Sequence, residues 1–349
     1  MLFWLGQVLS EVWGPFRQLT FYLTLTGLGT ALAAVATWVL LPRLWTRLPT
    51  DKGRAHAVGA ESSIGKPVSA GSIFIPLFCV VVLLFVPWSA GIVEAVLLLL
   101  AAMAVGHVDD RRRGGLSEYT LAAFDAVIAF AGAAVVCQLQ PTQLWLPFVA
   151  GSYQIPPLLF VPIGSGLIWL SINATNCSDG VDGLSGSLCV VALMALGVML
   201  YLIVGHEQIS AYLLLPHYAH AAQWGMLAFL MIGCLGGYLW YNAPPSSVLM
   251  GDAGSRPLGL LVGLLVMATG NPFLIFVAAG VVLANGATGL LKVALLRFLN
   301  IGIFRNVRYP LHDHVRHKYG WSNAQVLVRF TLLQAVVTAT LMVLLLKIR

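Results

Sequence analysis

Long apolar stretches alternate with short polar segments along the whole chain, and this alternation is the strongest pattern in the sequence. A helix of about 20 apolar residues is long enough to cross the hydrocarbon core of a bilayer. The stretches that reach or approach this length are 20–41, 71–88, 90–107, 121–140, 157–172, 184–204, 223–240, 257–270, 272–291 and 326–346. The pattern therefore predicts an all-α polytopic membrane protein with about ten transmembrane helices.

The composition supports this prediction and excludes an ordinary soluble domain. Of the 349 residues, 59% are hydrophobic and only 9% are charged, and the mean hydropathy is +0.89. Soluble domains carry roughly a quarter of charged residues. The five cysteines are scattered without paired spacing, which is typical of small core residues rather than of disulfides or a metal site. Because no repeat or soluble domain is visible, residues 1–349 are expected to form a single integral membrane domain.

Most charged residues fall on one side of the predicted membrane. If every stretch crosses the bilayer, that side holds the segments 42–70, 108–120, 173–183, 241–256 and 292–325. Fifteen of the 19 Lys and Arg residues lie there, so the positive-inside rule makes this side cytoplasmic and both termini external. The net charge of +6 thus reflects membrane orientation rather than nucleic-acid binding. Nine of the 13 acidic residues lie there too, which indicates an active face.

The densest polar segment of that face is 173–184, which carries Asn173, Asn176, Asp179 and Asp182 together with glycines that permit tight turns. Carboxylates and carboxamides together suit recognition of a nucleobase edge, ribose hydroxyls or a metal. A capped, Asn/Asp-rich turn would account for Asn173 and Asp182, but poorly for all four side chains. Polar clusters beside lipid are costly, so we predict a functional site here.

Two further acidic motifs lie on the same face. Asp109 and Asp110 close the third stretch, where adjacent carboxylates can hold Mg²⁺ with a substrate phosphate. The three arginines that follow also fit a charge-balanced helix end with no further role. Asp252 lies in the segment 250–255, just before the eighth stretch. That segment would present N–H groups to an anion and carry a metal to it, or would cap a helix through Asp252 or Ser255.

The histidine segment 310–321 is the fourth polar segment. His312 and His314 could bind a metal, but their i, i+2 spacing is weak support for it. With Arg316 and Lys318 nearby, contacts to a pyrophosphate are an equal alternative. A solvated loop without a role is the third interpretation.

Three structural expectations concern other residues. Asp125, inside the fourth stretch, is interpreted as the buried partner of Arg329 or as a substrate contact, and pairing is favoured. Between 292 and 310, apolar residues interleave with bases, which indicates either a basic helix along the membrane surface or an extension of the ninth stretch. The tryptophans that fit an interfacial aromatic belt are Trp4, Trp13, Trp88, Trp145 and Trp240.

Taken together, the four polar segments favour a metal-assisted reaction on an anionic substrate at the inner membrane surface. The sequence contains no Walker lysine motif, no Gly-x-Ser-x-Gly and no His-Glu-x-x-His. A secondary transporter is the alternative from another class. It would place ionisable residues near the bilayer midplane and show repeat symmetry. Here the acids lie at one surface instead.

These segments resemble, over nearly the whole chain, the polyprenyl-phosphate N-acetylhexosamine-1-phosphate transferase superfamily. The motifs that carry the resemblance are Asp109-Asp110, the segment 173–184, Met250-Gly-Asp252-Ala-Gly-Ser255, and Pro310-Leu-His312-Asp313-His314 with Gly320-Trp321 and Val328-Arg329-Phe330. The segment Lys66-Pro67-Val-Ser69-Ala-Gly71 resembles, in altered form, an early segment of the phospho-N-acetylmuramoyl-pentapeptide transferase branch. The histidine segment with its Gly-Trp pair also points to that branch.

The resemblance implies a bacterial inner-membrane enzyme of peptidoglycan synthesis with a cytoplasmic catalytic cleft. It would transfer phospho-MurNAc-pentapeptide from UDP-MurNAc-pentapeptide to undecaprenyl phosphate and release UMP, with Mg²⁺ as cofactor. The implied partners are both substrates and the lipid bilayer; a homodimer is compatible with the resemblance, and nucleic acid is not implied. A transferase of UDP-GlcNAc or another UDP-HexNAc is the alternative, and the histidine segment argues against it.

The resemblance also implies roles for individual residues. Catalytic roles fall on Asp109, Asp110, Asp252 and His312, with Asp109 as the base for the lipid phosphate. Asp252, Asp109 and Asp110 would be the Mg²⁺ ligands. The residues expected to bind substrate are Lys66, Asn173, Asn176, Asp179, Asp182 and His314. Direct attack and an aspartyl-phosphate intermediate both stay open.

The chain departs from the family pattern at several positions. Asp313 stands where the family has the middle one of three histidines, and Leu249 replaces an aromatic residue that often precedes Met-Gly-Asp. The pair Arg256-Pro257 is also unusual for the family.

Overall fold

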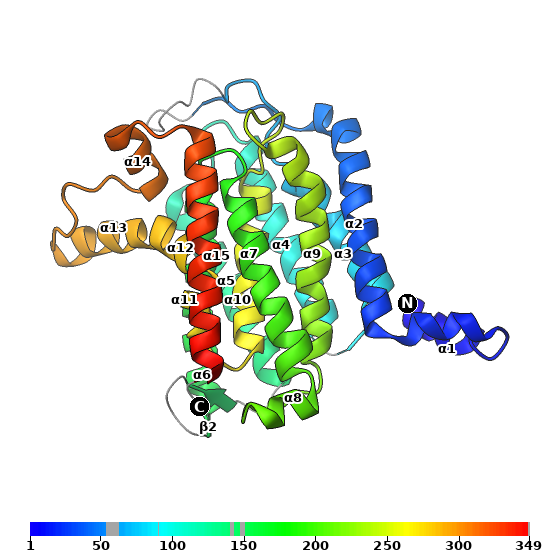
Figure 1. The fold of residues 1–349 in the computed structure, drawn as a ribbon. Coiled ribbons are helices and arrows are strands. Elements are labelled where there is room, and N and C mark those ends of the chain that lie inside the picture. The colour runs from blue at the N-terminus through cyan, green and yellow to red at the C-terminus, as the bar shows by residue number, and fades with distance from the viewer. Residues whose placement is uncertain (54–62, 90, 140–142, 147–150, 348–349) are drawn as a thin grey trace.

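The helices run mostly side by side in one bundle, with polar segments gathered at one end (Figure 1). The computed structural model describes residues 1–53, 63–89, 91–139, 143–146 and 151–347. Three charged residues counted above, Arg54, Glu61 and Arg349, lie outside these ranges, as do the first residue of stretch 90–107 and the last of 121–140. The beginning of α2 and the end of α15 lie at the end of the bundle opposite those segments, as an even number of crossings requires (Figure 1).

Each of the ten predicted stretches contains a helix among the described residues. They form α2 (Tyr22–Leu44), α3 (Gly71–Phe85), α4 (Ile92–Arg111), α5 (Glu118–Leu139), α6 (Pro157–Ser178), α7 (Leu184–Val198) with the π-helix η4 (Met199–Val204), α9 (Ala221–Asn242), α10 (Asp252–Ala268), the interrupted α11 (Leu274–Ala278), α12 (Gly280–Val282), π-helix η5 (Leu283–Ala287) and α13 (Thr288–Leu299), and α15 (Asn323–Lys347). Among the described residues, eight helical segments are long and apolar enough to cross a membrane, and α3 is a shorter apolar helix. The prediction of an all-α polytopic membrane protein is confirmed.

The remaining elements are short. They are α1 (Leu2–Leu9), η1 (Gly14–Thr20), η2 (Trp45–Arg47), α8 (Glu207–Tyr212), α14 (Leu311–Tyr319) and the antiparallel strands β1 (Gln143–Trp145) and β2 (Ser152–Gln154). The hairpin was not predicted. Trp145 is fully buried in it and donates its indole N–H to the Thr269 carbonyl at 2.8 Å, so its assignment to the aromatic belt is wrong. The other four tryptophans of that belt are exposed.

The central helix is α10, which packs against α3, α4, α5, α6, α7 and α9. Every residue from Ala253 to Ala268 is buried. Two glycines explain how closely the neighbouring helices approach its first turn. A Cβ atom at Gly106 of α4 would overlap the Asp252 carbonyl group, and one at Gly71 of α3 would overlap the Gly254 backbone. Because no side chain intervenes, α3 and α4 contact the α10 backbone directly.

Two helices extend further than the apolar pattern predicts. α4 continues to Arg111 and α6 to Ser178, so several polar residues expected in loops lie on helices. Within α6 the polar side chains bond both to the helix itself and to neighbouring helices. The Asn173 amide donates to the Trp169 carbonyl at 3.0 Å, and the Ser178 hydroxyl donates to the Ala174 carbonyl at 2.8 Å. Because these side chains find partners inside the bundle, α6 continues beyond its apolar residues.

The ninth stretch is broken between α11 and α12. Gln334 of α15 bridges this break: its Oε1 accepts the Val281 N–H at 2.7 Å, and its Nε2 donates to the Ala278 carbonyl at 2.8 Å. Thr338, one turn later, donates to the Val277 carbonyl at 2.8 Å. Backbone groups freed by a helix break at membrane depth require such internal partners.

Beyond the break, α13 projects sideways from the bundle, across the direction of the other helices (Figure 1). It continues directly from η5 and ends at Asn300, which has a left-handed conformation with φ +56°. Residues 300–310 are not helical. The ninth stretch is therefore extended beyond residue 291, as one expectation held, and the helix is broken and turns away from the bundle, as the other held.

Candidate active site

The carboxylate of Asp110 caps the first turn of α10. Its Oδ1 accepts the Asp252 N–H at 3.0 Å, and its Oδ2 accepts the Ala253 N–H at 3.1 Å. The N-terminal N–H groups of a helix attract an anion because they are unpaired and carry the positive end of the helix dipole. The sequence predicted that this helix start would hold an anion, and part of that role is filled by a side chain of α4.

Asp252, the first residue of α10, is held through both carboxylate oxygens. Its Oδ1 accepts the amide of Asn176 on α6 at 2.9 Å. Its Oδ2 accepts the Nε–H of Arg256, one turn along α10, at 2.9 Å, and Nη2 of the same guanidinium forms an ion pair with this oxygen at 2.9 Å. Oδ1 accepts one described bond, which leaves it a second lone-pair site.

Asp109, the neighbour of Asp110, belongs to the same cluster. Its Oδ1 accepts the Leu116 N–H at 2.5 Å, which ties the last turn of α4 to the loop that follows. Gly115, with φ +69°, lets this loop fold back, and a Cβ atom there would contact the Asp109 carboxylate at 3.0 Å. The chain is therefore shaped around this side chain.

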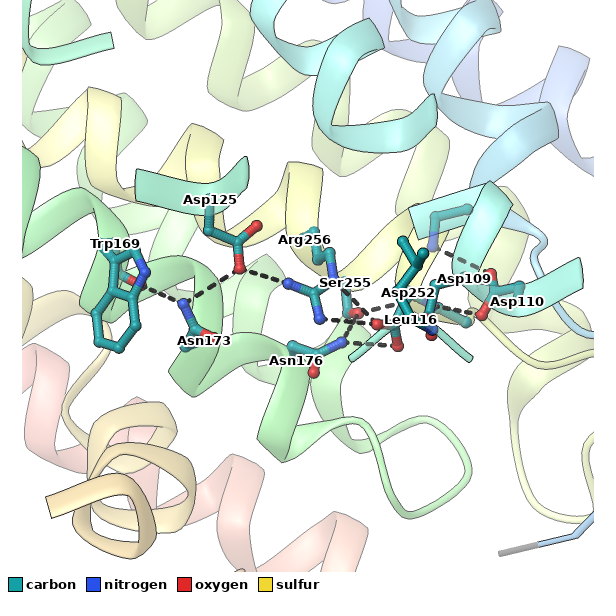
Figure 2. A network of polar contacts seen from close by, with 12 residues as sticks. Asp109, Asp110, Leu116, Asp125, Trp169, Asn173, Asn176, Asp252, Ser255 and Arg256 are labelled. Carbon is teal, nitrogen blue, oxygen red and sulfur yellow. Dashed lines mark hydrogen bonds and ion pairs between the residues drawn. The ribbon is translucent and has the colours of Figure 1, made fainter. Parts of the chain in front are cut away.

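Asp109, Asp110 and Asp252 can each offer one oxygen to a common point, because those three oxygens lie within 4.8 Å of one another. Mg²⁺ prefers carboxylate oxygens supplemented by water and substrate phosphate. The three carboxylates are neither fully exposed nor fully buried, which leaves access for such a ligand. The donor set therefore fits Mg²⁺. Two helices far apart in sequence supply it, as Figure 2 shows.

A buried ion pair lies behind this cluster. Arg256, with a side chain only 4% exposed, bonds both Asp252 and Asp125 of α5, whose side chain is 1% exposed. The prediction that Asp125 forms a buried pair is thus confirmed, but the prediction that Arg329 is its partner is wrong. Arg329 lies over the Trp321 ring instead, with its guanidinium carbon 4.2 Å from the ring centroid.

The two asparagines of α6 extend the network from the cluster into the membrane-spanning part (Figure 2). Asn176 donates to Asp252 at 2.9 Å and to the Ser255 hydroxyl at 3.0 Å. Asn173, one turn earlier, donates to Asp125 at 3.3 Å as well as to the Trp169 carbonyl. The i, i+3 spacing puts both amides on one face of α6, towards α5 and α10.

Lys66 and Asp182 form a second polar group. The Lys66 ammonium lies 3.1 Å from the Ser246 hydroxyl and 4.0 Å from the Asp182 carboxylate. Asp182 also accepts the Ser246 N–H at 3.1 Å. The segment that carries Lys66 is joined to the residues that lead into α10, because Gly71 donates to the Met250 carbonyl and Leu249 donates to the Pro67 carbonyl. The early segment and the segment 250–255 therefore meet, as the active-face hypothesis requires.

The two histidines named by the sequence are separated. His312 is buried, with Nδ1 within 3.2 Å of the Asn285 side chain, and its ring lies where a Cβ atom of Gly180 would be. It thus packs against the turn that follows α6, which begins at Asp179. His314 instead accepts the Arg308 N–H at 3.2 Å. Two residues apart on a helix means opposite faces, so a shared metal site for this pair is not formed.

Sequence reasoning did not assign a site role to Arg256, Ser255, Ser246 or Asn285. Arg256 was noticed only as a departure from the family pattern. A base within four residues of the acid Asp252 on a buried helix was the available signal, because such a spacing puts both on one helix face. Ser255 was named only as a helix cap and within the family motif, whereas Ser246 and Asn285 gave no signal, since small polar residues are common near helix ends.

Comparison with known proteins places this arrangement in a class. Residues 92–270 match the family described as glycosyl transferase family 4, and this range contains α4 to α10 with all three clustered carboxylates. Fold and site together therefore define a polytopic membrane transferase.

The relatives narrow the class further. A phospho-N-acetylmuramoyl-pentapeptide-transferase of Treponema pallidum (strain Nichols) is 43% identical over 98% of this chain and 95% of its own length. Transferases of the same name from Nautilia profundicola and Dinoroseobacter shibae are 29% and 28% identical, over 81% and 96% of this chain and over 82% and 97% of their own lengths. The chain belongs to the phospho-N-acetylmuramoyl-pentapeptide-transferase family.

Proposed function

We propose that this protein transfers phospho-MurNAc-pentapeptide from UDP-MurNAc-pentapeptide to undecaprenyl phosphate, giving undecaprenyl-diphospho-MurNAc-pentapeptide and UMP. The observation that carries the proposal is the convergence of Asp109, Asp110 and Asp252 at the start of a buried helix. The name of the Treponema relative at 43% identity supports the same reaction.

The chemistry requires a nucleophile and a stabilised leaving group. A phosphate oxygen of the lipid attacks the sugar-linked phosphorus, and the bond to the UMP oxygen breaks. We assign Asp109 as the base that takes the proton of the lipid phosphate, because it stands at the exposed end of α4 beside the other acids. Asp252, Asp109 and Asp110 would hold Mg²⁺, which neutralises the diphosphate when bound.

The other residues would position the substrates. Lys66 and Asp182, linked through Ser246, are assigned to the nucleotide, and the lysine supplies a positive charge near its phosphates. Asn176, Asp179 and Asn173 line the adjoining turn and helix of α6. His312, packed on Gly180, is assigned to the pyrophosphate as a late catalytic contact, and His314 to substrate on the outer face of α14.

The proposed setting is the bacterial cytoplasmic membrane with the acidic cluster facing the cytoplasm. The distribution of Lys and Arg supports this orientation. The nucleotide substrate is soluble and the acceptor is a lipid, so an active site at the end of a membrane bundle gives both access. The lipid bilayer is then a working partner, and a homodimer is compatible with the arrangement.

The test is UMP release by purified protein in detergent with undecaprenyl phosphate and Mg²⁺, comparing UDP-MurNAc-pentapeptide with UDP-GlcNAc. We expect turnover of the muramyl substrate, reduced at least about a thousandfold by Asp252→Asn and Asp109→Asn. Glu94→Gln is the matched control, because Glu94 bonds only the Gly91 N–H at the far end of α4 among the bonds described. Turnover of UDP-GlcNAc alone would reassign the substrate, and release from neither would reject the transferase.

A further inference from the structure

We infer that the buried pair Asp125–Arg256 positions Asp252 for a divalent cation. Arg256 orients the Asp252 carboxylate, and Asp125 neutralises the positive charge that Arg256 would otherwise bring to the cation site. This inference rests on the proposed metal-dependent function. Arg256 is the basic residue that contacts the acidic cluster among the described ion pairs. Its presence next to a cation site needs explanation, because a positive charge there repels the cation.

The orientation effect follows from the geometry of the guanidinium group. Arg256 donates from Nε to Oδ2 of Asp252 and places Nη2 2.9 Å from the same oxygen, while Asn176 donates to Oδ1. These contacts hold both oxygens of the carboxylate. Oδ1 accepts one described bond and keeps a second lone-pair site, through which Asp252 would bind a cation.

The charge effect follows from the second partner. Nη1 of Arg256 bonds the carboxylate of Asp125, so one guanidinium links two acids across α5 and α10. Both side chains of this pair are almost fully buried, which weakens screening by water. A buried base with one acid would donate a full positive charge to the site. With Asp125 present, the pair is neutral, and Asp109, Asp110 and Asp252 keep their full charge towards the cation.

Asn173 holds the far end of this pair. Its amide donates to Oδ2 of Asp125, the oxygen that also accepts from Arg256. Figure 2 shows the resulting row from Trp169 through Asn173, Asp125 and Arg256 to Asp252. Each buried charge in this row has a partner, as burial in a low-dielectric interior requires. The cation site is therefore connected to groups well inside the bundle.

The decisive measurement is Mn²⁺ binding to detergent-purified protein, followed by the electron paramagnetic resonance signal of free Mn²⁺. Asp125→Asn leaves Arg256 unneutralised, so we expect the Kd for Mn²⁺ to rise roughly ten- to a hundredfold. The double variant Asp125→Asn/Arg256→Gln removes both charges and should recover most of that loss. Arg256→Gln alone should bind Mn²⁺ at least as tightly as the parent protein, while UMP release falls because Asp252 is no longer oriented.

Controls separate this inference from folding and from the proposed function. Glu94→Gln on α4 removes one negative charge, as Asp125→Asn does, and Arg329→Gln on α15 removes one positive charge, as Arg256→Gln does. Neither residue contacts the Asp125–Arg256 pair in the described bonds, so both variants should keep the parent Kd for Mn²⁺. Unfolding temperatures identify a variant that fails to fold. In that case the Kd for Mn²⁺ of the charge-balanced double variant is compared with that of the parent protein. Equal weakening by Asp125→Asn, Arg256→Gln and the double variant would overturn the inference. If the parent protein does not bind Mn²⁺, or if Asp252→Asn binds it with the parent Kd, the metal site of the proposed function is rejected instead.

Discussion

The first turns of α10 and α14 both begin polar segments of the active face, yet they are held in different ways. The first turn of α10 is contacted by neighbouring backbone on two sides, through Gly71 and Gly106, and is capped by Asp110. The first turn of α14 is held through a side chain, because His312 bonds Asn285 and packs on Gly180. The comparison teaches that polar segments of one face can be held either by close contact of backbones or by one buried side chain.

The largest expected effect comes from adding one methyl group where backbone meets backbone. Gly106→Ala places a Cβ atom against the Asp252 carbonyl, which cannot move without moving α10. We expect a loss of at least about 1–3 kcal/mol in unfolding free energy and a fall of a hundredfold or more in UMP release. Thermal unfolding in detergent and the release assay measure the two.

The matched control for this change is Gly236→Ala on α9. A Cβ atom there meets no other atom within 4 Å, so stability and turnover should stay at the parent values. Because alanine has the higher helix propensity, equal losses in both variants would mean that the effect at Gly106 does not come from the close approach of α4 to α10.

An intermediate effect is expected when the cap of α10 loses its charge. Asp110→Asn keeps the shape of the side chain but turns an N–H₂ group towards one of two N–H donors. We expect a loss of about 1–2 kcal/mol in stability and at least a tenfold lower turnover. Glu94→Gln changes a similar cap bond at the other end of α4, at 2.8 Å to the Gly91 N–H. It should lower stability comparably and leave turnover intact; a parallel loss of turnover there would assign the Asp110 effect to folding alone.

The smallest effects sharpen the description of α14. His312→Ala removes the imidazole from the buried Asn285 side chain and keeps only the bond from the backbone N–H, so we expect about 1–3 kcal/mol of destabilisation and roughly tenfold lower turnover. His314→Ala removes a bond to the Arg308 N–H on the outer face and should change stability by less than about 0.5 kcal/mol. Unfolding midpoints and KM for the nucleotide sugar distinguish the two variants, and similar results for both would contradict the role of His312 in holding α14.

The sequence was sufficient to predict the spans, their order and the meeting of the polar segments, because hydrophobic length and charge parity report on these directly. It was not sufficient to pair Asp125. At 1.5 Å per residue, Asp125 lies about 10 Å into α5, Arg256 about 6 Å into α10 and Arg329 about 9 Å into α15 from the same end of the bundle. Both Arg256 and Arg329 therefore lie at a depth that would allow pairing with Asp125. The packing of α5 against α10 makes Arg256 the partner.

The helix ends were misjudged for a related reason. Asn173 and Asn176 look like loop residues, because asparagine is common in turns. Inside α6, however, their amides find carboxylates on α5 and α10, and this tertiary pairing outweighs the local preference. The hairpin β1–β2 was missed because its strands are only three residues long and carry no clear alternation.

The break between α11 and α12 has a consequence for the order in which the chain is made. The groups freed at the break are satisfied by Gln334 and Thr338, which follow the Val281 N–H by more than fifty residues. A ribosome delivers those residues only after α13 and α14. Until α15 enters the membrane, the freed N–H and C=O groups must find water or lipid headgroups instead. Insertion of the last helix is therefore the step that completes the ninth span. Truncation before Asn323 should leave the backbone groups at the break without their hydrogen-bond partners on α15, even though the sequence of the span is intact.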